Sequence, residues 1–213
     1  MPKKKPKYYV VWKGVQPGIY NSWEECKLQI TNFPTAEYKS FPNLELAKKA
    51  FAESYHDYKG KKFFSSELSA AQLKSIGAPE LNSVAVDAAC AGNPGIMEYR
   101  GVETATGNQI FKKGPYQKST NNVGEFLALV HALALMKKTG DRRIIYSDSK
   151  IAIGWVKVGK CRTKLAKTAE NADSFELIQR AELWLKNNRP LLNPILKWET
   201  KAWGEIPADF GRK

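Results

Sequence analysis

The order of strand-like and helix-like segments after residue 82 restricts most strongly what this chain can fold into. The predicted elements are strands at 83–89, 96–102 and 108–113, a helix at 124–138, a strand at 144–147, helices at 149–156 and 172–188, a strand at 195–199 and a turn of helix after residue 206. Strands joined by short turns run antiparallel, and strands joined by helices run parallel. With the helices at 149–156 and 172–188 counted as one helical connection, the order is βββαβαβα. It predicts an α/β domain with a mixed five-stranded sheet and helices on both faces.

A smaller domain is predicted before this sheet. Ser22, with Glu25 three residues later, has the pattern of a helix start, and Asn43 opens a second helix. Strand-like runs are found at 8–12, 18–20 and 36–40. These segments predict a three-strand, two-helix α+β module. Because the patterning weakens between the two regions, we expect a first domain at 1–52, a linker at 53–82 and a second domain at 83–213.

Charge narrows the class of partner. The chain has 34 Lys and Arg against 21 Asp and Glu, a net charge of +13, and 43% of its residues are hydrophobic. That apolar content excludes a disordered basic tail, and the positive charge favours a polyanion such as nucleic acid. We expect no membrane contact and a cytoplasmic location, because no long apolar run or signal peptide is evident. No protein partner is evident, and we expect a monomer. Three scattered cysteines indicate neither disulfides nor a zinc site.

Four carboxylates are the candidate catalytic groups. Asp87 and Asp148 come at strands that should be buried, Glu125 in the first turn of a helix, and Asp209 near the C-terminus. Buried carboxylates are costly unless they are paired or bind a metal, and clustered oxygen ligands suit Mg²⁺ or Mn²⁺. Two such ions can promote phosphodiester cleavage. The spacing alone leaves open that these residues are ordinary helix caps and strand ends.

Four short segments carry a family resemblance: 86–95 (VDAACAGNPG), 120–129 (TNNVGEFLAL), 146–149 (YSDS) and 206–209 (IPAD). In this order they resemble the signature segments of type 1 ribonuclease H, and the similarity runs from about residue 83 to the C-terminus. The resemblance implies that Asp87, Glu125, Asp148 and Asp209 hold two Mg²⁺ ions, with Mn²⁺ as an alternative. It also implies cleavage of the RNA strand of RNA/DNA hybrids, leaving 3′-hydroxyl and 5′-phosphate ends.

The same resemblance implies a set of substrate contacts. Cys90, Gly92, Asn93 and Asn121 would face the RNA minor groove. The residues Thr120, Asn122 and Thr163 would grip a phosphate of the DNA strand, and Trp155 would pack on a deoxyribose. Core packing is the alternative role for Trp155.

One departure from the common family pattern concerns the loop before Asp209. Many members carry a histidine there, whereas this chain has Glu205 four residues before Asp209, as in a subgroup that lacks the histidine. The resemblance implies a role for Glu205 at the second metal or the product phosphate. A solvated carboxylate is the alternative.

The N-terminal module resembles the hybrid-binding domain found in some ribonucleases H. By that resemblance Tyr9, Trp23 and Tyr38 would contact DNA sugars and Lys39 a phosphate, while Ser40 replaces a second expected lysine. Trp23 and Tyr38 could instead form the core of a small domain. Together these features predict a Mg²⁺-dependent endonuclease acting on RNA/DNA hybrids. A non-catalytic hybrid-binding protein and a related nuclease acting on DNA are the alternatives.

Overall fold

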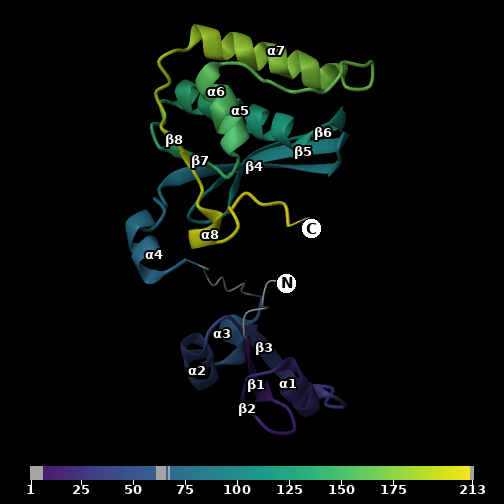
Figure 1. Ribbon diagram of the computed structural model, residues 1–213, viewed down its shortest axis with the longest axis vertical. Coiled ribbons are helices and arrows are strands. Elements are labelled where there is room, and N and C mark those ends of the chain that lie inside the picture. Colours follow the sequence, from purple (N-terminus) through teal and green to yellow (C-terminus); the bar gives the residue numbers. More distant parts are fainter. Residues whose placement is uncertain (1–6, 61–65, 67, 212–213) are drawn as a thin grey trace. The chain divides into compact units, whose positions relative to one another are not determined.

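The chain folds into two compact units, Met1–Glu67 and Leu68–Lys213. The computed structural model describes residues 7–60, 66 and 68–211 (Figure 1). Among these residues no helix is long and apolar enough to cross a membrane. Each unit has its own sheet and its own core of buried side chains.

The first unit is built on a small antiparallel sheet with strand order β2-β1-β3. Its elements are β1 (Tyr8–Lys13), β2 (Gly18–Tyr20), α1 (Trp23–Ile30), β3 (Glu37–Phe41), α2 (Leu44–Ala52) and α3 (Tyr55–Tyr58). The predicted helix starts are confirmed: Ser22 Oγ accepts from the amide of Glu25, and Asn43 Oδ1 accepts from the amide of Leu46. This unit is the predicted three-strand α+β module, with one additional short helix.

The additional helix α3 lies in the segment 53–82 that the sequence predicted as a linker. It contributes Tyr58, which is buried against Phe41 with ring centroids 5.6 Å apart. The indole of Trp12 donates to the backbone oxygens of Ala50 and Glu53 and so joins β1 to the end of α2. The packed core of the first unit therefore includes residues beyond Ala52.

The second unit contains the predicted mixed sheet, with strand order β6-β5-β4-β7-β8. The strands are β4 (Ser83–Gly92), β5 (Gly95–Glu103), β6 (Gln109–Ser119), β7 (Ile144–Ser147) and β8 (Ile195–Lys197). Pairing is antiparallel for β4–β5 and β5–β6, and parallel for β4–β7 and β7–β8. This arrangement confirms the fold class predicted from the order of segments.

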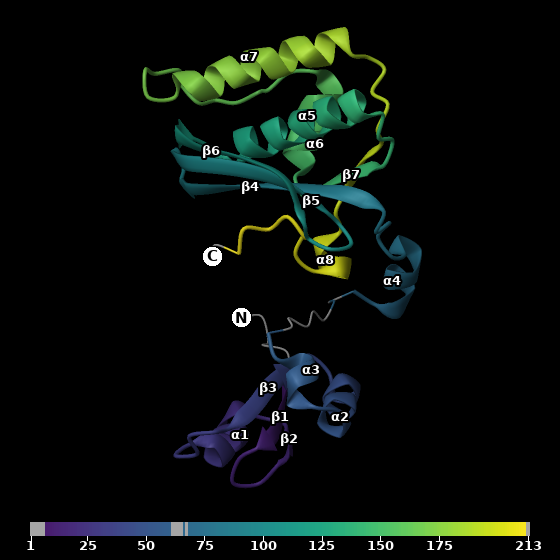
Figure 2. The same cartoon turned by 180° about the vertical axis from the view of Figure 1, so that it is seen from behind.

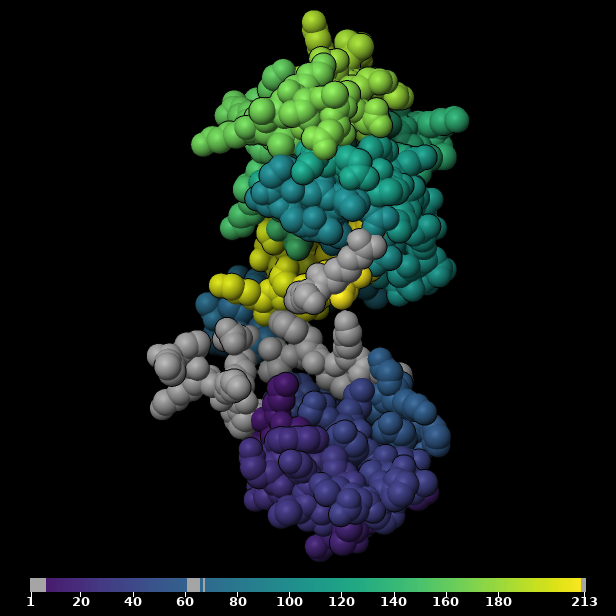
Figure 3. All heavy atoms as spheres, turned by 90° about the vertical axis from the view of Figure 1, so that its right-hand side faces the viewer, coloured from purple at the N-terminus to yellow at the C-terminus, as the bar shows by residue number. Residues whose placement is uncertain are grey.

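Helices cover the two faces of this sheet unequally. The long helices α5 (Asn121–Thr139), α6 (Lys150–Val158) and α7 (Ala172–Asn187) lie together on one side, where they enclose the main core (Figures 1 and 2). The other side carries the short helix α8 (Thr200–Trp203) and the C-terminal residues that follow it. Figure 3 shows these C-terminal residues, in yellow, against the teal residues of the sheet.

A second, smaller core fixes the C-terminal segment to its face of the sheet. Tyr146, Trp198 and Trp203 pack with edge-to-face geometry at centroid separations of 5.0 to 5.8 Å. The indole of Trp203 also donates to the carbonyl of Gly77, just after α4 (Ala70–Ile76). Residues 70–77, within the predicted linker, are thus attached to the second unit.

The predicted turn of helix after residue 206 is a single hydrogen-bonded turn and not part of a helix: the amide of Asp209 donates to Ile206 O at 2.8 Å. The helical turn comes earlier, as α8, and ends at Gly204, whose φ of +84° is a left-handed conformation. Ile206 and Ala208 are both buried in the smaller core with Tyr146 and Trp198, while Pro207 between them is half-buried. Burial of these two side chains against the sheet holds the turn in place.

Candidate active site

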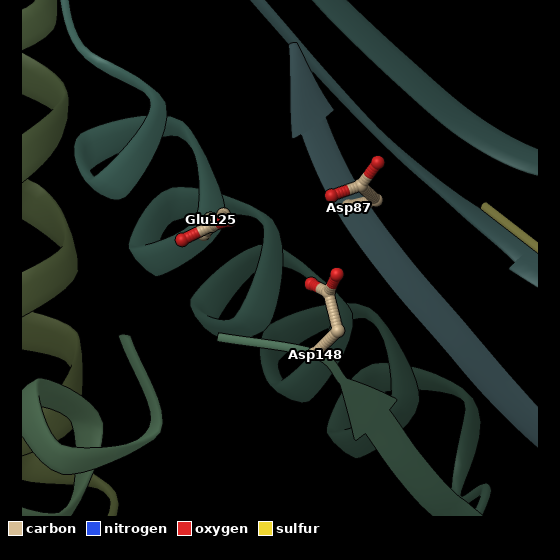
Figure 4. Close-up of side chains that lie close together, drawn as sticks. All are labelled: Asp87, Glu125 and Asp148. Carbon is tan, nitrogen blue, oxygen red and sulfur yellow. The ribbon is translucent and has the colours of Figure 1, made fainter. Parts of the chain in front are cut away.

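Three carboxylates from three different elements converge at one edge of the large sheet (Figure 4). Asp87 projects from β4, Glu125 from the first turns of α5, and Asp148 follows the last residue of β7. Each offers an oxygen that lies within 4.8 Å of the others. The parallel register of β4 and β7 explains why Asp87 and Asp148 lie close together. Ala85 is paired with Tyr146, and each aspartate comes two residues later along the chain.

A glycine beside Glu125 allows the helix to approach the sheet. A Cβ atom at Gly124 would lie 2.7 Å from the Cβ of Ala88 and 2.8 Å from the Sδ of Met97. Any larger residue would push α5 away from β4 and carry Glu125 away from Asp87. The side-chain amide of Asn121 (Nδ2) donates to Glu125 Oε1 at 2.8 Å and orients the carboxylate from within the same helix.

Burial and repulsion by neighbouring carboxylates raise the pKa values of all three acids. Burial, followed by the charge of Asp148, raises the pKa of Asp87 to about 8. Burial is also the largest cause of the raised pKa of Glu125, about 7, and of the raised pKa of Asp148. Lys197 opposes the shift at Glu125 and Asp148 by stabilising their negative charge. The protein alone therefore does not stabilise the three charges fully.

The cluster opens into a cavity of about 390 Å³ that includes the two remaining predicted acids. Glu205 is exposed and Asp209 is half-buried in its wall. Among the described residues, Asp209 is not part of the set of oxygens within 4.8 Å of one another. All five predicted acids therefore line one cavity, and three of them form a tight group.

A second cavity, of about 420 Å³, adjoins the first because Cys90 and Asn121 line both. It brings together six of the eight predicted substrate-binding residues of this unit: Cys90, Gly92, Asn93, Thr120, Asn121 and Asn122. Thr120 caps α5, its Oγ1 accepting from the backbone amide of Val123 at 3.4 Å. The side chain of Asn122 is therefore not used for capping.

The other two predicted substrate residues, which also belong to the described part of the chain, do not line these cavities. Trp155 is on α6 and packs against the main core, its ring 6.2 Å from that of Phe126 in an edge-to-face arrangement. Thr163 follows α6, and its Oγ1 accepts from the amide of Leu165 at 3.2 Å. Their contacts with substrate stay predictions.

In the first unit, the three predicted aromatic residues form a row. The Trp23 ring centroid lies 5.7 Å from that of Tyr9 and 6.0 Å from that of Tyr38. Trp23 and Tyr38 are each 40% exposed, so they are not the core of the unit. Lys39 follows Tyr38 in β3, so its side chain leaves the opposite face of the sheet.

The sequence reasoning missed two residues at the edge of the first cavity. Phe210 lines it directly, and Arg100 contacts the backbone of the segment that carries Asp209. Arg100 pairs with Asp87 across β4 and β5. A signal was available for Arg100, because an arginine directly opposite a catalytic candidate in a predicted meander lies on the same face of the sheet.

The three central carboxylates suit a hard cation. Glu125 Oε2 and Asp148 Oδ1 are buried and have no hydrogen-bond partner among the described residues. All donor atoms of the group are oxygens, which Mg²⁺ and Mn²⁺ prefer. A bound cation would supply the partner that these oxygens lack and stabilise the charged form of each acid.

Comparison with known proteins agrees with both units. Residues 80–198, more than half of the chain, match the family model described as RNase H, and residues 7–51 match that of the ribonuclease H1 N-terminal domain. A ribonuclease H of Neorickettsia sennetsu is 37% identical over 130 residues, which cover 59% of this chain and 79% of the relative.

Other relatives are matched over shorter stretches. A ribonuclease H of Crithidia fasciculata is 34% identical over 79 residues, or 37% of this chain, and one of Saccharomyces cerevisiae is 49% identical over 41 residues, or 19% of it. The chain spans only 16% and 12% of the length of these two proteins.

Solved structures give weaker matches. A crystal structure of LC11-RNase H1 in complex with RNA/DNA hybrid has a TM-score of 0.33 at 23% identity, covering 56% of this chain and 87% of that one. The family-model match to more than half of the chain and the 37% identity to the Neorickettsia protein are decisive: the chain belongs to the ribonuclease H family.

Proposed function

We propose that this protein is a divalent-metal-dependent endonuclease that hydrolyses the RNA strand of RNA/DNA hybrids and leaves 3′-hydroxyl and 5′-phosphate ends. The observation that carries the proposal is the group of Asp87, Glu125 and Asp148, with oxygens within 4.8 Å of one another, inside the region that matches the family model. Buried acids with raised pKa values in a cavity are typical of a catalytic site.

The chain's own residues would prepare this site for cations. Asp87, Glu125 and Asp148 would hold Mg²⁺, and Asp209, on the wall of the same cavity, would complete the ligands for a pair of ions. Bound cations of this kind activate a water molecule and stabilise the leaving oxygen of a phosphodiester. Asn121 holds Glu125 in place through its 2.8 Å hydrogen bond, and Glu205 would act at the exposed mouth of the cavity.

The adjoining second cavity supports a hybrid as substrate. An enzyme that cuts RNA only when it is paired with DNA must distinguish the 2′-hydroxyl of one strand from its absence on the other. Asn93, Asn121 and Asn122 offer amide donors and acceptors, and Thr120 a hydroxyl, beside the carboxylate group. The row of Tyr9, Trp23 and Tyr38, in which Trp23 and Tyr38 are exposed, would give the first unit a separate surface for sugars of the same hybrid.

Replacing one central acid tests the catalytic assignment. We expect Asp148→Asn to bind hybrid as the wild type does and to lose at least about 100-fold in cleavage rate with Mg²⁺, because an amide is a weaker cation ligand. Binding is measured by fluorescence anisotropy and cleavage with a labelled 20-base-pair hybrid. The matched control is Asp173→Asn, an exposed acid on α7, which should cleave at the wild-type rate. Cleavage by Asp148→Asn at the wild-type rate would contradict the proposal.

Three duplexes separate the proposal from its alternatives. RNA/DNA, RNA/RNA and DNA/DNA substrates of one sequence are compared in Mg²⁺ with wild-type protein, and products are checked for 5′-phosphate ends. Cleavage confined to the RNA strand of the hybrid supports the proposal. Cleavage of DNA indicates a related DNA nuclease, and binding without cleavage indicates a non-catalytic hybrid-binding protein.

A further inference from the structure

Asp209 comes from a segment without regular secondary structure, so something else must set its place beside the other acids. The described residues from Gly204 to Gly211 belong to no helix or strand. Two hydrogen bonds of Asp209 stay within this segment: its amide donates to Ile206 O at 2.8 Å, and its Oδ2 accepts from Gly211 N at 2.9 Å. Both are local and neither ties the segment to the sheet.

Arg100 makes that connection from β5. Its Nε donates to the carbonyl of Ala208 at 2.8 Å, and its Nη2 donates to the carbonyl of Asp209 at 2.6 Å. Two donors of one planar group thus bind two consecutive carbonyls, which defines both the position and the direction of the backbone. The guanidinium carbon also lies 4.7 Å from the centroid of the Phe210 ring, so three successive residues are held by one side chain.

The position of Arg100 in the sheet relates its contacts with the two carbonyls to the position of the acids. Arg100 is directly opposite Asp87 in the antiparallel register of β4 and β5, so the two side chains leave the same face of the sheet. The residue that holds the Asp209 backbone is therefore carried on the same rigid sheet as Asp87. We propose that Arg100 is a positioning residue, which places the Asp209 carboxylate at the cavity by binding the carbonyls of Ala208 and Asp209.

A role of Arg100 as a positive charge alone predicts other results than a role in binding the two carbonyls. Arg100 is half-buried, and Nε and Nη2 of its guanidinium both donate to main-chain oxygens. Lys112, its cross-strand neighbour on β6, supplies a second positive charge on the same face, with Nζ 5.9 Å from the Phe210 ring and 3.0 Å from a carboxylate oxygen of Glu98. Lys112 therefore offers a matched control for loss of charge without loss of the carbonyl contacts.

The kinetic test uses the full chain and rests on the proposed function. We expect Arg100→Lys, which keeps the charge but cannot bind both carbonyls in the same geometry, to lower kcat on hybrid roughly 10- to 100-fold. KM for hybrid should stay within about twofold, and the Mg²⁺ concentration for half-maximal rate should rise, because Asp209 would no longer be held at the cavity. Lys112→Met should change kcat, KM and the Mg²⁺ concentration for half-maximal rate by no more than about twofold each.

A double-mutant cycle shows whether Arg100 acts through Asp209. If it does, Arg100→Lys should have almost no further effect on kcat in an Asp209→Asn background. Effects that multiply in the double variant, or an Arg100→Lys variant with the kcat and Mg²⁺ dependence of the wild type, would overturn the proposal. A raised KM with unchanged kcat would also overturn it, because that result indicates a phosphate contact.

Hydrogen–deuterium exchange provides a measurement that does not depend on activity. In Arg100→Lys the amides of residues 204–211 should exchange several-fold faster than in the wild type, while those of β4 and α5 stay unchanged. Unchanged exchange at 204–211 would contradict the proposed grip. If the wild type cleaves no hybrid, the proposed function fails, yet this exchange measurement still decides whether Arg100 holds the segment.

Discussion

At the scale of single residues, the candidate site contains buried carboxylates that destabilise the metal-free fold. Asp87 and Glu125 are each only 7% exposed, and their pKa values are raised mainly by burial. The desolvation that makes these acids costly without a cation is the same feature that makes them suitable ligands for one. Activity and stability therefore depend oppositely on the same carboxylates.

This opposition predicts the pH dependence of the metal-free protein. The folded-state pKa of Asp87 is about 8, above the unfolded value near 4, so the folded state binds more protons between these values. The free energy of unfolding of the second unit should therefore fall as pH rises from about 4 to about 8. Asp87→Asn should remove much of this fall and stabilise the metal-free unit by roughly 2 to 5 kcal/mol at pH 9.

Urea unfolding at a series of pH values, in the presence of a chelator, measures this effect. Asp173→Asn, at an exposed position, should leave the pH profile of the wild type unchanged. Saturating Mg²⁺ should restore stability to the wild type at pH 9 but not to Asp87→Asn. A wild-type stability that rises between pH 5 and pH 8 without metal would be inconsistent with the assigned direction.

The sequence singled out the candidate acids, which the structure brings to one cavity, and indicated less of their surroundings. Asp87, Glu125 and Asp148 were recognisable because a carboxylate beside a buried strand, or in a helix's first turn within a family motif, is chemically unusual. The position of Arg100 opposite Asp87 could be read from the predicted meander, but its role could not, because that role depends on the carbonyls of Ala208 and Asp209, more than a hundred positions away. Backbone partners leave no pattern in the identity of the residues that supply them.

At the scale of elements, α3 is the clearest difference from expectation. Its four residues fall in the predicted linker, yet Tyr58 is 6% exposed and packs on Phe41 and Trp12. Its hydroxyl donates to the carboxylate of Glu53. So short a helix has no periodicity that a sequence pattern can reveal, and burial of one aromatic side chain is enough to hold it.

Removing that aromatic side chain tests the role of α3. Tyr58→Ala should destabilise the first unit by about 3 to 5 kcal/mol, since a buried aromatic ring is lost from a small core. Hydrogen–deuterium exchange of β1 and β3 in the full chain measures this locally, without assuming a single unfolding transition for both units. His56→Ala, at an exposed position of the same helix, should leave exchange unchanged. Slow, wild-type-like exchange in Tyr58→Ala would show that α3 is dispensable.

At the scale of the whole molecule, the +13 charge is divided between two units that each have a net positive charge. Two tethered binding modules raise the effective concentration of substrate at each other's sites. With the proposed function, this would favour long hybrids that can engage both units over short ones that can engage only the second.

Deleting residues 1–67 tests this division of labour. The shortened chain should cleave a short hybrid at close to the wild-type rate but bind a long hybrid roughly 10- to 100-fold more weakly. Its affinity should also depend less steeply on salt, because fewer phosphates are neutralised. Anisotropy titrations on long hybrid at several salt concentrations give both quantities. An unchanged affinity and salt slope would show that the first unit does not bind the hybrid.

By itself, the sequence determined the order of strands and helices in the large sheet, the family resemblance and the identity of the acids, because these depend on local periodicity and on rare residue types at motif positions. Only the tertiary structure decided that Ile206 and Ala208 are buried in the smaller core, that α3 belongs to a core, and that Arg100 binds the backbone beside Asp209. These features depend on burial against a distant surface and on main-chain partners. Neither can be read from the residues near them in sequence, since the free energy that fixes them comes from contacts formed only when the sheet has assembled.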